Sequence, residues 1–125
     1  MSRFSVVPAL ALVVAALPGA AWAGDAAKGK AVFTAQCSIC HRSAAGAPPA
    51  IGPNLFHVVG RKAGTLAGYS YSPAMKTFGK PWTVAQLNAY LAAPQTVVKG
   101  NKMPFAGISD AARRDDVVAY LATLK

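Results

Sequence analysis

The stretch Cys37-Ser38-Ile39-Cys40-His41 most constrains what this chain of 125 residues can fold into. It separates the chain's two cysteines by two residues and places a histidine directly after the second one. A disulfide between the cysteines would close a loop too small to restrict the unfolded chain, so a structural crosslink is a poor explanation. Three explanations remain: a redox dithiol, half of a zinc site, or covalent attachment of haem.

The rest of the chain favours haem among these three. A dithiol of the thioredoxin type usually lies between a strand and a helix, and no stretch of this sequence has the pattern of a strand. A zinc site needs four ligands, whereas the only other histidine, His57, has no further ligand close to it in sequence. In the haem signature each thiol joins one vinyl group of the porphyrin, which places His41 beneath the iron as a ligand.

A second axial ligand has to come from elsewhere in the chain, and the candidates are His57, Met75 and Met103. Met75 has the spacing of a buried helical residue, and a lone histidine such as His57 more often makes surface hydrogen bonds. Met103 lies in the irregular stretch GNKMPFAGI, where a thioether is better explained as an iron ligand than as core packing. A Met/His pair raises the reduction potential of haem iron relative to two histidines.

The N-terminal segment has the three-part layout of a secretory signal: Arg3, an apolar stretch over residues 9–17, and the small residues of Ala21-Trp22-Ala23. The alternative is a retained membrane anchor, but the uninterrupted apolar run has nine residues, against roughly 20 for a bilayer. We therefore expect a cleaved signal peptide over residues 1–23, a folded domain over residues 24–125 and a periplasmic location.

The folded domain is expected to be all-α. Good capping residues precede four helical patterns, at Asp25, Ser72, Thr83 and Ser109. The stretch 43–68 is dense in glycine and proline and predicts a long irregular loop. A loop of that length is unusual in a compact domain unless it wraps something.

Five motifs, taken in order, resemble those of class I cytochromes c, near the mitochondrial proteins and the bacterial cytochromes c2. They are CSICH, IGPNLFHVVGRKAG, GYSYSPAMKTFGKPW, LNAYLAAP and NKMPFAGI. The likeness covers essentially the whole chain after the expected signal peptide. It implies a small helical fold in which the N- and C-terminal helices cross and long loops wrap one covalently attached haem c.

The resemblance also implies how the haem is attached and ligated. Cys37 and Cys40 would hold it through two thioethers, and His41 and Met103 would be the iron ligands. The carbonyl of Pro53 would accept a hydrogen bond from the second ring nitrogen of the ligand histidine, which orients the ring and makes it a better donor.

Four further residues match haem contacts of the family. Arg61, Tyr71 and Trp82 match the residues that hold one buried haem propionate, whose charge is costly to bury without partners. Tyr90 matches the tyrosine whose hydroxyl meets the sulfur of the ligand methionine. Each aromatic residue also has a simpler explanation, because aromatic side chains bury large areas in any small core.

The function implied is a soluble single-haem electron carrier that cycles between Fe(II) and Fe(III), and not an enzyme, because protein ligands fill both axial positions. The alternatives are a haem enzyme or sensor with a labile methionine ligand, such as a weak peroxidase, or a subunit of an oxidase or dehydrogenase complex. As a carrier it would be a monomer without membrane insertion. Its partners would be redox proteins such as a cytochrome bc1 complex, a terminal oxidase, a photosynthetic reaction centre or a dehydrogenase.

The net charge of +9 favours an acidic protein partner over nucleic acid, because basic residues are not interleaved with aromatic ones. The family's ring of lysines at the haem edge is nevertheless largely missing, although Lys102 remains. A contact centred on the apolar residues Ile39, Pro104 and Phe105 is therefore expected. Other residues stand at the lysine positions: Ala31, Gln36, Ala50, Gln95, Thr96, Ser109 and Asp110.

Overall fold

The structure, a computed structural model, describes residues 11, 13 and 24–125, so the signal peptide expected over residues 1–23 lies outside the described residues apart from those two positions. The described part is helical and contains no strand, only one isolated antiparallel bridge between Lys62 and Pro81. This confirms the expected all-α class. Its helices are α1 (Ala26–Gln36), α2 (Pro73–Phe78), α3 (Val84–Ala92), α4 (Pro94–Val97) and α5 (Ala111–Ala122).

No helix among these described residues has the length and apolar character needed to cross a membrane.

Three of the four capping residues predicted from the sequence cap their helices. The carboxylate of Asp25 accepts hydrogen bonds from the first-turn amides of α1, at 2.9 Å from Ala27. The hydroxyl of Ser72 accepts from the amide of Met75 in α2 at 3.1 Å, and the hydroxyl of Thr83 caps α3 in the same way. These bonds satisfy backbone donors that a helix leaves unpaired at its start.

The fourth predicted cap, Ser109, is wrong by one residue. Asp110 has the extended backbone of a capping residue, and its carboxylate accepts from the amide of Arg113 at 3.1 Å. The negative charge of a carboxylate at this position also interacts favourably with the positive end of the helix dipole. A neutral serine hydroxyl interacts with it more weakly. Ser109 lies outside α5, where its carbonyl accepts from the guanidinium of Arg114 at 2.8 Å.

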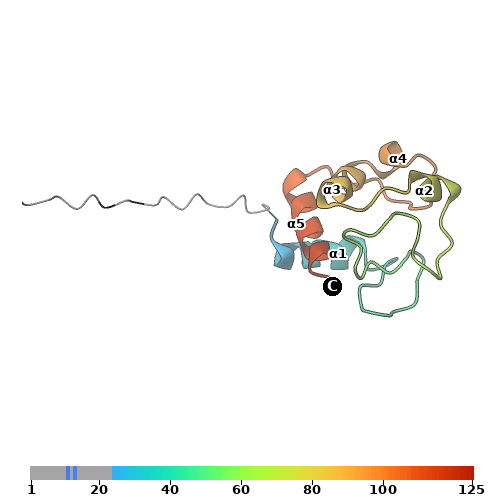
Figure 1. Cartoon of the computed structure of the whole chain (residues 1–125), viewed down its shortest axis with the longest axis horizontal. Coiled ribbons are helices and arrows are strands. Elements are labelled where there is room, and N and C mark those ends of the chain that lie inside the picture. Colours follow the sequence, from blue (N-terminus) through green and yellow to red (C-terminus); the bar gives the residue numbers. More distant parts are fainter. Residues whose placement is uncertain (1–10, 12, 14–23) are drawn as a thin grey trace, which may run out of the picture.

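The first and last helices cross in close contact, as the resemblance implied (Figure 1). Val32 and Phe33 of α1 and Val117 of α5 are buried in the core, and the ring centroid of Phe33 lies 5.3 Å from that of Tyr120. The crossing point is at Gly29, where an added Cβ would overlap the carbonyl oxygen of Asp116. The absence of a side chain at this position therefore sets how closely the two helices approach.

Helix α3 packs against α5 of the crossing pair and also contacts α4 (Figure 1). Tyr90 of α3 and Trp82, which precedes this helix, are both buried, with ring centroids 4.9 Å apart. The long loop is tied to the end of α5, because the amide of His57 donates to the carbonyl of Leu124 at 2.7 Å. His57 is the only non-glycine residue with a positive φ, 61°, in the described part of the chain.

Candidate haem site

A cavity lies between the crossing pair, helices α2 and α3 and the long loop, and every predicted site residue lines it. Segments far apart in the sequence supply its walls, since α5 contributes Val117 and Leu121 while α1 contributes Phe33. Apolar side chains dominate the lining, as is usual for a ligand cavity. The predicted site residues in the lining are Cys37, Cys40, His41, Pro53, Arg61, Tyr71, Trp82, Tyr90 and Met103.

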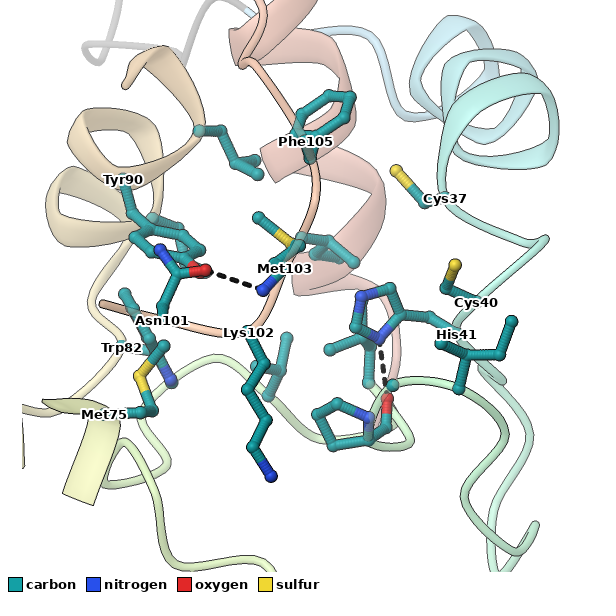
Figure 2. Close-up of a pocket in the computed structure, with 18 of the residues that line it drawn as sticks. Cys37, Cys40, His41, Met75, Trp82, Tyr90, Asn101, Lys102, Met103 and Phe105 are labelled. Carbon is teal, nitrogen blue, oxygen red and sulfur yellow. Dashed lines mark hydrogen bonds between the residues drawn. The ribbon is translucent and has the colours of Figure 1, made fainter. Parts of the chain in front are cut away.

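The ring of His41 is held in one orientation. Its Nδ1 lies 2.7 Å from the carbonyl oxygen of Pro53, so Nδ1 is the donor and Nε2 keeps its lone pair. Figure 2 shows the second ring nitrogen directed away from Pro53, toward the space beside Met103. Burial lowers the pKa of His41 more than the bond to Pro53 raises it, and the charge of Arg61 lowers it further. The imidazole is therefore neutral near pH 7 and able to bind a metal ion.

Gly52 is part of this arrangement, although the sequence pattern did not single it out. A Cβ at this position would lie 2.6 Å from Cε1 and 2.8 Å from Nδ1 of His41. The ring therefore packs directly against the backbone of Gly52, next to its hydrogen-bond acceptor Pro53.

The thiols of Cys37 and Cys40 are free and half-buried at the edge of the cavity. Burial, together with the neighbouring Cys40, raises the pKa of Cys37 to about 11. Redox-active dithiols have a lowered pKa, so this environment argues against the dithiol explanation. Nor does the described part of the chain hold any group of three or more His, Cys, Asp or Glu side chains placed to bind a metal ion, which argues against a zinc site.

Of the three candidates for a second axial ligand, Met103 and Met75 line the cavity and His57 does not. Met103 is half-buried in an irregular segment and lines the cavity (Figure 2). Met75 also reaches the cavity but is buried in α2 as part of the hydrophobic core, as its spacing predicted. His57 is exposed and does not line this cavity.

Tyr90, which carries a hydroxyl group, and Arg61, which is a cation, both line the cavity. Burial, with a smaller effect from Tyr69, raises the pKa of Tyr90 to about 12, so its hydroxyl stays a hydrogen-bond donor. The guanidinium of Arg61 donates to the carbonyl of Asn54 at 3.1 Å and to that of Phe56 at 3.3 Å. Since a guanidinium has five N–H donors, Arg61 can also bind an anionic group.

Tyr71 lies close enough to Arg61 for each to shift the other's pKa. The structure adds Tyr69 to the lining, with its ring centroid 4.7 Å from that of Tyr71 in an edge-to-face arrangement. Tyr69 is in the GYSYSP motif, but sequence reasoning selected only the second tyrosine of that motif.

The residues present fit a haem. A largely apolar cavity would accept its porphyrin, and both thiols lie in one short segment that ends in a neutral histidine. A thioether lines the same space, and Arg61 and Tyr71 are polar groups in the lining that could face the propionates. When bound, haem supplies an iron centre that gains and loses one electron.

Comparisons with known proteins agree with this geometry. The family model described as cytochrome c matches residues 26–125. Cytochrome c2 of Rhodomicrobium vannielii is 47% identical over 91% of this chain and 93% of the relative. Cytochrome c of Euglena viridis is 43% identical over 82% of this chain and 99% of the relative. Among solved structures, cytochrome cH from Methylobacterium extorquens has a TM-score of 0.75 and 46% identity, covering 80% of this chain and 99% of that one.

The fold and the site thus define a small haem protein of the electron-transfer class. The chain belongs to the cytochrome c family, and it resembles the cytochromes c2 within that family. It is accordingly a single-haem electron carrier rather than an enzyme, and it binds one covalently attached haem c.

Proposed function

We propose that this chain carries electrons between redox proteins of the periplasm, with Cys37 and Cys40 as the haem attachment points and His41 and Met103 as the iron ligands. The observation that carries this proposal is that the His41 ring and the Met103 thioether come from distant segments and line one apolar cavity. If His41 and Met103 hold the iron as proposed, protein would fill both axial positions and leave no open site for oxygen or peroxide. This favours a carrier over a haem enzyme or sensor.

The remaining residues have distinct roles in this proposal. Pro53 holds the His41 ring through the 2.7 Å contact to Nδ1 and so fixes which nitrogen faces the iron. Arg61, Tyr71 and Trp82 would bind one propionate and compensate its charge. Tyr90, which lines the same cavity as Met103, would donate its hydroxyl to the Met103 sulfur.

The proposal is tested by visible spectra and a haem stain on a denaturing gel, with protein produced alongside haem-maturation machinery. We expect the wild type to keep haem through denaturation and to show a ferric methionine–iron band. The double variant Cys37→Ser/Cys40→Ser should lose its stain, because no thioether can form. Ser38→Ala is the matched control. The Ser38 hydroxyl donates to the carbonyl of Thr34 in α1 at 2.6 Å and forms no thioether, so the stain should persist.

Two results would contradict the proposal in different ways. Colourless protein from the wild type would exclude haem attachment altogether. Retained haem without the methionine band would keep the attachment and move the function to an open-site enzyme or sensor.

We further propose that partners dock through an apolar contact near the cysteines. Ile39 lies between Cys37 and Cys40 and is 73% exposed, so its apolar side chain is available for contact with a partner. Pro104 is also exposed, and Phe105 is half-buried beside the cavity.

Replacing Ile39 with serine is expected to slow electron transfer from a bacterial cytochrome bc1 complex about fivefold, as for an apolar interface anchor. The reduction potential should not change. The control Lys28→Gln removes a charge from an exposed position of α1 and should leave the rate nearly constant. Stopped-flow rates at several ionic strengths check this, because charge-driven docking would instead give a steep salt dependence and a slower Lys28→Gln variant.

A further inference from the structure

The segment that holds Met103 belongs to no helix or strand and is anchored by two side-chain amides, those of Gln95 and Asn101. Asn101 has 9% of its surface exposed, and its Nδ2 donates to the carbonyl of Pro94 at 3.1 Å and to that of Val98 at 3.0 Å. Its Oδ1 accepts from the backbone amide of Met103 at 2.7 Å (Figure 2). One buried side chain therefore joins both ends of the single-turn helix α4 to the backbone of Met103.

Gln95, the second residue of α4, makes complementary contacts from the solvent side. Its Nε2 donates to the carbonyl of Asn101 at 3.1 Å and reaches that of Met103 at 3.5 Å, while its Oε1 accepts from the amide of Gly100 at 3.3 Å. The two amides, called here the amide clamp, thus contact both the N–H and the C=O of Met103. Gln95 is exposed, so its bonds compete with water and contribute less than those of Asn101.

We propose that the amide clamp is a positioning device that keeps the Met103 thioether in the cavity and sets how often it leaves. The inference rests on the proposed role of Met103 as an iron ligand. A thioether is neutral and a weaker ligand than an imidazole, so its retention depends on the backbone that presents it. In the described structure that backbone has few other anchors; one of them is Lys102, whose Nζ donates to the carbonyl of Ser70 at 2.8 Å.

The removal of Asn101 has a defined cost. Asn101→Ala leaves the amide of Met103 and the carbonyls of Pro94 and Val98 without their partner, and unpaired buried groups are expensive in the closed segment. In an opened segment water can reach all three groups. The substitution therefore shifts the equilibrium toward the open state, in which Met103 is away from the cavity.

Imidazole measures this equilibrium, because it can bind the ferric iron only while Met103 is away, and its apparent affinity scales with the open fraction. Titration of the ferric holoprotein, followed by loss of the methionine–iron band, should give an affinity about tenfold higher for Asn101→Ala and about twofold to threefold higher for Gln95→Ala. Asn101→Ser should recover part of the wild-type behaviour, since a serine hydroxyl can also accept from the amide two residues later.

Asn88→Ala is the matched control. Asn88 donates to Asp115 at 2.7 Å and accepts from Arg114 at 3.2 Å, so it links α3 to α5 outside the cavity lining. It should lower global stability, measured by circular dichroism in denaturant, without raising imidazole affinity. Equal imidazole affinity in Asn101→Ala and the wild type, or an equal rise in Asn88→Ala, would overturn the clamp. A wild type that lacks the methionine band would instead overturn the role of Met103 itself.

Discussion

Replacing Met103 with alanine is expected to lower the reduction potential of the haem by on the order of 100 mV. The thioether sulfur is a soft ligand that stabilises Fe(II) relative to Fe(III), and alanine leaves that position to water or another hard ligand. The methionine–iron band of the ferric protein should disappear in the same variant. A spectroelectrochemical titration of the wild type and the variant measures both effects.

Met75→Leu is the matched control for this experiment. Met75 is the other methionine of the cavity lining, but it is 9% exposed and packed in the core. Leucine is a close match in volume, so the substitution tests whether any methionine near the cavity tunes the potential. We expect a far smaller change than for Met103→Ala. A Met103→Ala variant that keeps both the band and the potential would show that Met103 is not a ligand.

The parts of the fold that were predictable from the sequence are those with short-range causes. Asp25, Ser72 and Thr83 each cap the helix that follows them through a bond to an amide two or three residues away. The Ser109 prediction failed because two adjacent polar residues can both cap, and the choice of Asp110 depends on the backbone path that enters α5. The approximate start of a helix can therefore be predicted from the sequence. Which of two neighbouring residues caps the helix depends on the whole fold.

The site divides in the same way. The motif from Cys37 to His41 predicts its chemistry because covalent attachment needs those residue types at that spacing. The amide clamp could not be read from the sequence, since Gln95 and Asn101 contact Met103 only after α4 has formed next to it. The packing of Gly52 against the His41 ring likewise depends on a contact between separate segments. Spacing predicts the groups that react, while the groups that orient them depend on long-range packing.

The largest effect on stability is expected at Gly29, where α1 crosses α5. In an isolated helix, glycine to alanine is stabilising by about 1 kcal/mol. In this protein an added Cβ would overlap the carbonyl oxygen of Asp116 and lie 2.9 Å from the amide nitrogen of Val117. These are backbone atoms, which cannot move away by a change of rotamer as a side chain can, so the two helices must move apart. We expect Gly29→Ala to lower the free energy of unfolding by about 3 kcal/mol, as for severe overpacking.

Denaturant unfolding of the holoprotein, followed by circular dichroism, measures this change, with Lys30→Ala as a control on an exposed position of the same helix. The control should change the free energy of unfolding by less than about 0.5 kcal/mol. Because Val117 lies both at the crossing and in the cavity lining, the overlap should also reach the site. The methionine–iron band of Gly29→Ala is therefore expected to disappear at a lower denaturant concentration than in the wild type. An unchanged free energy of unfolding in Gly29→Ala would mean that α1 and α5 can move apart without loss of stability. It would also mean that the distance between these helices does not determine the shape of the cavity.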